Sequence, residues 1–95
     1  PRERIARWTV ARSLRSLGRV EEALELQRDL AAELDAAGEP DGYVFEEIGE
    51  CLHALERSDD ARPWFARAYV ELARDPSLVD SEPERLERLR SLGGS

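Results

Sequence analysis

Two stretches of this chain match each other when one is shifted by 38 residues, and this internal repeat is the feature that most limits the fold. In the first stretch Ala11 is followed 12 residues later by Ala23, and in the second Gly49 is followed 12 residues later by Ala61. Apolar residues flank both pairs at the three-to-four spacing of an amphipathic helix. Because self-similarity of this length is typical of stacked helical repeats, each stretch is predicted to be one helix-turn-helix unit.

The apolar spacing and the residues that end helices divide the chain into five predicted helices and no strand, which makes the fold class all-α. Gly18 and Gly38 end the first two helices, and Pro76 follows the fourth. Ser58 or Asp59 is predicted to cap the fourth helix, and residues 81–84 have the form of a capping box. The predicted helices, in chain order, cover about residues 3–17, 20–37, 42–56, 59–74 and 81–92. The short turns between partners predict antiparallel pairs.

Composition bounds the class of protein. Ninety-five residues are enough for one small domain, predicted to span residues 1–95, and the missing initiator Met suggests a piece of a longer chain. The chain has no apolar run long enough to cross a bilayer and no signal peptide, and its single cysteine cannot form an internal disulfide, so a cytoplasmic location is expected. All 14 cationic side chains are Arg, as expected from a GC-rich genome, and the absence of Lys excludes a phosphate-loop lysine and a Schiff base.

Charge is unevenly distributed along the chain. Residues 1–19 sum to +5, residues 20–60 to −12 and residues 61–95 to zero. The first interpretation is that Arg12 and Arg15 face the acids Glu46, Glu47 and Glu50 of the third predicted helix, in surface ion pairs worth under about 1 kcal/mol each. An exposed anion-binding role for these arginines is the alternative. Nucleic acid is disfavoured as a partner, because the whole chain carries a net charge of −7.

The second unit resembles the tetratricopeptide repeat (TPR) in its spacing of large and small residues, and the first unit is a degenerate copy. The matching residues of the second unit are Phe45, Ile48, Gly49, Leu52, Ala61, Phe65 and Ala68. Those of the first are Val10, Ala11, Leu14, Gly18 and Ala23, whereas Arg7, Gln27 and Leu30 depart from the pattern. The step of 38 exceeds the family's step of about 34. The resemblance implies a TPR-like α-α superhelix with repeats at about residues 4–37 and 42–75, followed by a capping helix at about 81–92.

In this family the first helix of each repeat lines a concave groove that binds a peptide or helix. Carried over by position, the resemblance assigns a partner-binding groove to Trp8, Arg12, Arg15, Tyr43, Glu46, Glu50 and His53, with Ile5, Thr9, Ser16 and Glu47 beside them. Some relatives clamp a peptide carboxylate with Lys and Asn, and this chain has neither, so that mode is disfavoured. Trp8 has an alternative role in packing against an upstream repeat.

The residues capable of catalysis do not form a site in the sequence. Cys51 and His53 lie two residues apart on one predicted helix, so their side chains point in nearly opposite directions and cannot form a dyad. Cys51 is predicted to be a buried apolar residue, and His53 a surface or groove residue. The acids Glu46, Glu47 and Glu50 are interpreted as a solvated helix face. The sequence therefore predicts no catalytic residue, no metal and no cofactor.

These observations lead to one expected function and two alternatives. The chain is expected to be a non-catalytic protein-protein interaction or scaffold module that binds a protein or peptide partner in its groove. One alternative is a homodimerisation module, in which Ile5, Trp8 and Val10 pair across a two-fold axis. The other is a sensor or regulatory fragment of a larger regulator or ATPase. Trp64 is expected to lie beneath the last helix, covered by Leu86, Leu89, Leu92 and Leu72.

Overall fold

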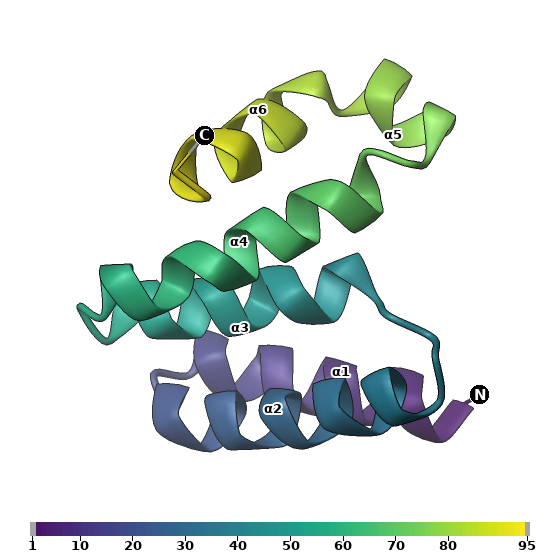
Figure 1. Ribbon diagram of the computed structural model, residues 1–95. Helices are drawn as coiled ribbons and strands as arrows, with labels where there is room; N and C mark the ends of the chain where they lie inside the picture. Colours follow the sequence, from purple (N-terminus) through teal and green to yellow (C-terminus); the bar gives the residue numbers. More distant parts are fainter. Residues whose placement is uncertain (1, 95) are drawn as a thin grey trace.

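The computed structural model describes the backbone of residues 2–94 and the side chains of residues 6–94, and that part of the chain contains helices and turns but no strand. The helices are α1 (Arg2–Ser16), α2 (Val20–Ala36), α3 (Gly42–Ala54), α4 (Ser58–Leu72), α5 (Pro76–Ser81) and α6 (Pro83–Leu92). Neighbouring helices pack antiparallel, and Figure 1 shows them in three tiers: α1 with α2, α3 with α4, and α5 with α6. The all-α prediction is confirmed, but the prediction of five helices is wrong.

The additional helix is α5, which lies between the fourth and the fifth predicted helices. The side chain of Asp75 accepts a hydrogen bond from the backbone N–H of Ser77 at 2.9 Å and so caps α5. The helix cannot continue into α6, because Pro83 has no N–H to donate and disfavours helical geometry at Glu82. The predicted capping box at residues 81–84 is therefore wrong. Ser81 is the last residue of α5, and its hydroxyl donates to the carbonyl of Ser77 at 2.6 Å.

The turns inside the first two tiers are the same turn, repeated 38 residues apart. The N–H of Arg19 donates to the carbonyl of Leu14 at 2.9 Å, and the N–H of Arg57 donates to the carbonyl of Leu52 at 2.8 Å. The residue before each arginine is left-handed, with φ of +85° at Gly18 and +59° at the equivalent position of the second turn. The internal repeat in the sequence therefore corresponds to a repeat in backbone geometry.

The fourth helix is not capped as predicted. The N-cap position belongs to Arg57, whose side chain makes no capping hydrogen bond, and Ser58 is already helical. The guanidinium of Arg57 instead pairs with Asp60 at 3.0 Å, just as Arg19 pairs with Glu22 at 2.7 Å in the first unit. An acid in the first turn of a helix is favoured by the helix dipole, so these pairs keep a negative charge at both helix starts.

Small residues allow the helices of each tier to pack closely. Ala23 and Ala61 are both buried, as the repeat predicts. At Gly49 of α3, an added Cβ atom would lie 2.8 Å from the ring of Phe65 in α4, closer than real Cβ atoms approach. The absence of a side chain at Gly49 therefore lets the Phe65 ring lie directly against the α3 backbone. These residues belong to one core that runs through all tiers.

The apolar stripe predicted for the first helix is only partly buried. Ala11 is buried, but Val10 is 53% exposed and Leu17 is 75% exposed. The reason is that α1 lies at the end of the stack, so no helix covers its outer side (Figure 1). Ile5, which was predicted on the same stripe, lies outside the described side chains.

The last helix docks on α4 as expected, but not over Trp64. An added Cβ at Gly93 would lie 3.0 Å from the backbone of Ala66, so the end of α6 lies close against that side of α4. Residues two apart on a helix point in nearly opposite directions, which places Trp64 on the other side from Ala66. Its ring instead lies 6.0 Å from that of Phe45 and within 5.3 Å of the Arg67 guanidinium. Trp64 therefore joins α4 to α3.

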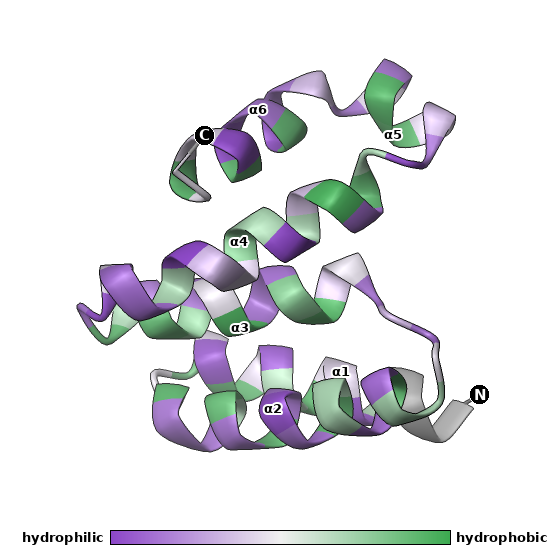
Figure 2. Cartoon of the chain, in the orientation of Figure 1, coloured by the Kyte–Doolittle hydropathy of each residue, from purple (hydrophilic) through white to green (hydrophobic). Residues whose placement is uncertain are grey.

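Each helix carries hydrophilic and hydrophobic residues side by side, and none is apolar throughout (Figure 2). Among the described residues, no helix has the length and apolar character needed to cross a membrane.

Candidate functional site

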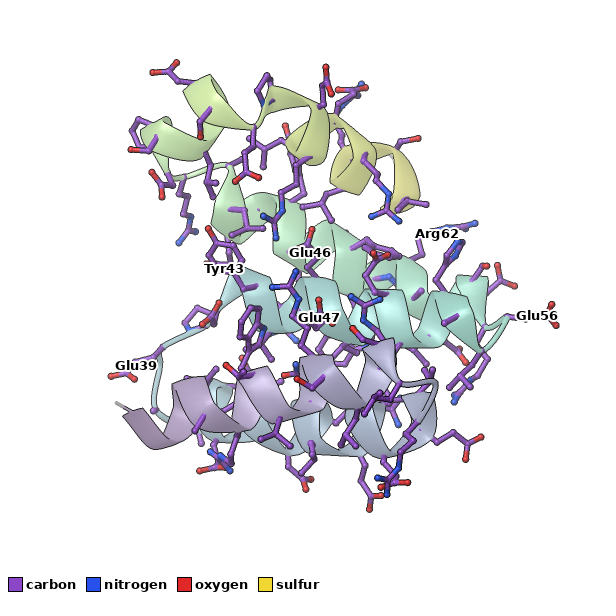
Figure 3. The ribbon with its side chains drawn as sticks, turned by 180° about the vertical axis from the view of Figure 1, so that it is seen from behind. Glu39, Tyr43, Glu46, Glu47, Glu56 and Arg62 are labelled. Carbon is purple, nitrogen blue, oxygen red and sulfur yellow. The ribbon has the colours of Figure 1, made fainter. Side chains whose placement is uncertain are left out.

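One face of the molecule carries rows of opposite charge from three helices. Figure 3 shows this face, with α1, α3 and the α5–α6 segment one above another and Glu46 and Glu47 of α3 between them. Glu47 is only 6% exposed, and its carboxylate accepts two hydrogen bonds from Arg15 of α1, at 2.7 and 3.1 Å. Arg12 is a more distant partner of the same carboxylate, at 3.9 Å. The internal pairing predicted for the two arginines is therefore confirmed at Glu47.

The other two acids of α3 face the opposite neighbour. Glu46 is 7% exposed and accepts hydrogen bonds from both Nε and Nη2 of Arg85, the former at 3.1 Å. Glu50 accepts a hydrogen bond from Arg88 at 2.9 Å. The interpretation of these acids as a solvated face is therefore wrong, because α6 covers them, and they pair with α6 rather than with α1. We call this set of seven charged residues the ion-pair strip: Arg12, Arg15, Glu46, Glu47, Glu50, Arg85 and Arg88.

Hydrogen bonds to carboxylates keep two arginines of the strip, Arg15 and Arg85, in the charged form. The hydrogen bond to Glu47 raises the pKa of Arg15, with burial opposing it, and the hydrogen bond to Glu46 raises the pKa of Arg85 in the same way. Both guanidinium groups stay charged, so the buried carboxylates keep their partners. Four of the seven residues predicted for the partner groove belong to this strip: Arg12, Arg15, Glu46 and Glu50. A fifth, His53, lies further along α3. The carboxylates of Glu46 and Glu50 are already paired inside the molecule.

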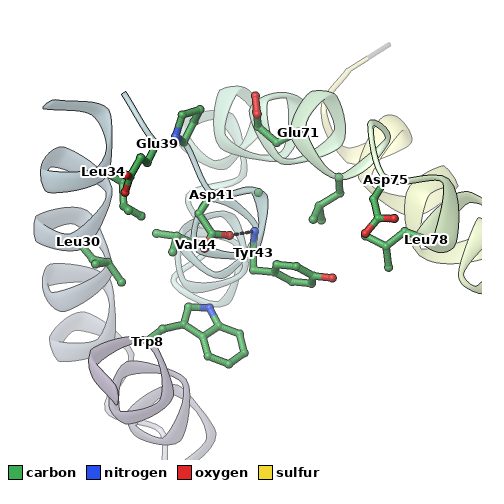
Figure 4. A pocket seen from close by; sticks show the side chains of 13 residues that line it. Trp8, Leu30, Leu34, Glu39, Asp41, Tyr43, Val44, Glu71, Asp75 and Leu78 are labelled. Carbon is green, nitrogen blue, oxygen red and sulfur yellow. Dashed lines mark hydrogen bonds between the residues drawn. The ribbon is translucent and has the colours of Figure 1, made fainter. Parts of the chain in front are cut away.

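A cavity of about 680 Å³ lies beside the strip, where α3 begins and α4 ends (Figure 4). Its floor is apolar and comes from α2, α3, α4 and α5. Among the residues whose side chains the structure describes, its rim carries four carboxylates and no basic side chain. The lining residues are Trp8, Leu30, Leu34, Pro40, Gly42, Tyr43, Val44, Leu72 and Leu78, with Glu39, Asp41, Glu71 and Asp75 as the acids. Two of the predicted groove residues, Trp8 and Tyr43, therefore lie at this cavity.

The ion-pair strip holds the two aromatic side chains of the cavity in place. The Arg12 guanidinium lies 5.3 Å from the centre of the Trp8 ring, and the Arg85 guanidinium lies 5.1 Å from that of Tyr43. Such cation–π contacts fix the orientation of a ring as well as stabilise it. The side-chain amide of Gln27 also donates to the Trp8 carbonyl at 3.4 Å, which anchors the backbone behind the indole.

Trp8 carries a polar group without a partner. Its indole Nε1 is buried, and no described residue accepts a hydrogen bond from it. A buried donor without an acceptor costs roughly 1 to 3 kcal/mol, so its presence in a folded chain calls for an explanation. Figure 4 shows the indole beside Tyr43 and Val44 at the edge of the cavity.

Three of the rim carboxylates have partners within the chain, which are backbone N–H groups for two of them and an arginine for the third. Asp41 caps α3, accepting a hydrogen bond from the N–H of Tyr43 at 2.8 Å, and Asp75 caps α5. Glu71 pairs with the exposed Arg74 at 3.3 Å. Backbone N–H groups do not neutralise a carboxylate as an arginine does, so Asp41 and Asp75 keep negative charge at the rim.

The chain's cysteine and histidine do not come together. Cys51 is fully buried, as predicted, and burial raises the pKa of its thiol to about 11. His53 is exposed at the far end of α3, where its Nδ1 lies 3.4 Å from the Ser58 hydroxyl. No group of three or more His, Cys, Asp or Glu residues in the described part of the chain is arranged to hold a metal ion.

Comparisons with known proteins add no further assignment. The chain matches no family model, no curated protein and no solved structure. Its function is therefore argued from its own geometry. That geometry separates a charged face, whose acids are internally paired, from an apolar cavity with an acidic rim.

Proposed function

We propose that this chain is a non-catalytic, TPR-like interaction module that binds a segment of a partner protein in the cavity lined by Trp8 and Tyr43. The observation that carries the proposal is the cavity itself. Its volume of about 680 Å³ lies within the range of roughly 300 to 1,000 Å³ typical of binding pockets, and its floor is apolar. Such a floor suits a large apolar side chain of a partner.

Three features support a TPR-like architecture. The turns of the first two tiers repeat at a step of 38 residues with matching hydrogen bonds. The small residues of the repeat pattern are buried where helices meet. The first helices of successive tiers lie along one face, which is the arrangement that gives helical-repeat proteins their extended binding surfaces. These features favour a binding scaffold over an enzyme.

Selection from a displayed library of random dodecapeptides tests the proposal. The whole chain serves as bait, and the selected peptides are measured individually by fluorescence polarisation. We expect a family of related sequences that bind reversibly with Kd values in the micromolar range and compete with one another. Enrichment no better than on the empty support would contradict the proposed function.

A homodimerisation module is the second candidate, favoured by the exposed side chains of Val10 and Leu17. Val10 lies on α1 and Leu17 directly follows the last residue of that helix, and both side chains are more than half exposed. Light scattering over a range of concentrations separates the two functions. A mass that rises to twice that of the chain and falls back in a Val10→Ser/Leu17→Ser variant would favour the dimer.

A further inference from the structure

We propose that the cavity selects a partner segment in which a bulky apolar side chain is flanked by Lys or Arg. This inference rests on the proposed function and specifies the chemistry of its ligand. It comes from the contrast between the two acidic regions of the molecule. In the ion-pair strip every acid accepts a hydrogen bond from an arginine, whereas Asp41 and Asp75 at the cavity accept hydrogen bonds from backbone N–H groups.

The shape of the site fits one apolar group with cations beside it. Leu30, Leu34, Leu72 and Leu78 are all nearly fully buried and form a floor that cannot bind a charged head group. The carboxylates lie around this floor and come from three different parts of the chain: the loop before α3, the end of α4 and the start of α5. A peptide whose apolar side chain enters the floor therefore passes its neighbouring residues over carboxylates on more than one side.

The cavity also has a candidate hydrogen-bond donor for the main chain of a bound segment. The partnerless indole N–H of Trp8 lies at the edge of the same cavity. A peptide carbonyl is a suitable acceptor for it. An extended segment thus has a floor for one side chain, carboxylates for its cations and one donor for its main chain.

Charge at the rim can be removed without removing the helix caps, which allows a clean test. Asn is as good an N-cap as Asp, so Asp41→Asn and Asp75→Asn keep an acceptor for the Tyr43 and Ser77 N–H groups. A matched control removes two acids from the exposed outer side of α2, in Glu25→Gln/Asp29→Asn. Thermal melts of both double variants establish that they fold.

The probes are the dodecapeptides selected against the whole chain. We expect Lys or Arg within two residues of a large apolar residue in the enriched sequences. We also expect the Asp41→Asn/Asp75→Asn variant to bind them about tenfold more weakly at low salt, which corresponds to about 1.4 kcal/mol, and the α2 control to bind within about twofold of the unmodified chain. Higher salt should reduce the difference in affinity between the rim variant and the unmodified chain, because the attraction between the carboxylates and the basic residues is electrostatic.

Other outcomes would overturn the inference in distinguishable ways. Selected peptides that lack basic residues, or that bind the rim variant as tightly as the unmodified chain, would contradict the inference and leave the proposed function standing. Failure to select any peptide would contradict both the inference and the proposed function. A second copy of the chain is the competing occupant. If light scattering shows a dimer that the rim variant dissociates, the partner segment is ruled out as the natural ligand.

Discussion

Gly18 and Glu56 occupy the same left-handed position in two turns that are otherwise alike, with φ of +85° and +59°. Glycine adopts this conformation freely, whereas an L-residue with a side chain pays roughly 1 to 2 kcal/mol. The second unit therefore keeps the geometry of the first without its glycine. The turn is imposed by the packing of the hairpin, and Glu56 holds a measurable strain.

Glu56→Gly should stabilise the chain by about 1 kcal/mol, because the strain is relieved and the exposed side chain makes no contact that the turn needs. Gly18→Glu should destabilise it by a similar amount. Urea unfolding of both variants gives the two free energies. A destabilised Glu56→Gly variant would contradict the equivalence of the turns.

Gly49→Leu should destabilise the chain by about 1 to 3 kcal/mol, because any Cβ at this position meets the ring of Phe65 in α4. Ala32→Leu introduces the same side chain at an exposed site on α2 and serves as the control, with an expected change below about 0.5 kcal/mol. Equal melting temperatures for the two variants would argue against close packing of α3 on α4.

Arg15→Ala should cost about 2 kcal/mol, because it leaves the buried Glu47 carboxylate with only the distant Arg12. The matched control is Arg19→Ala, which removes an exposed pair with Glu22 and should cost less than about 1 kcal/mol. Unfolding free energies in urea provide the comparison. If the two variants are equally stable, the ion-pair strip contributes no more than surface charges do.

Leu89→Ala should destabilise the chain by about 2 to 5 kcal/mol, because this α6 side chain is fully buried. Leu17→Ala makes the same change at a side chain that is 75% exposed and should have little effect. Thermal melts followed by circular dichroism give the difference. A small effect at Leu89 would indicate that α6 is not docked on α4 in solution.

Cys51 should be inert in the folded chain. Since the pKa of its thiol is raised from about 9 to about 11, the thiolate fraction at pH 8 falls about a hundredfold, and iodoacetamide should react slowly until urea is added. The folded state retains the proton better than the unfolded state. The protonated thiol therefore contributes its full stabilisation of the folded state below pH 9, and this contribution is lost as the pH rises towards 11. The Cys51→Ala variant should lack this part of the pH dependence of stability.

Much of the fold could be predicted from the sequence, because the repeat and the glycines are local signals. The turn after Gly18, the burial of Ala23 and the pairing of Arg15 with α3 all follow from residue type and spacing. The break between α5 and α6 was missed, although Pro83 marks it. The cap by Asp75 resembles the cap by Asp41 and was a second available signal.

The candidate site was harder to predict, because its parts come from five helices and a loop. Trp8 and Tyr43 could be selected by position, but nothing local links them to Leu78 of α5. The pairing of Glu46 with Arg85 depends on where α6 docks, which no spacing within α3 reveals. Tertiary packing therefore decides which acids pair with an arginine of another helix and which lie on the cavity rim.

The most direct test of this account is to map where a selected dodecapeptide binds, using amide and indole chemical shifts of the labelled chain. Because binding is proposed at the cavity, the largest shifts are expected at the Trp8 indole N–H and at residues 39–44 and 71–78. Arg12, Arg15 and Glu47 should change little by comparison. Shifts centred on the ion-pair strip, with the Trp8 indole unaffected, would contradict the account.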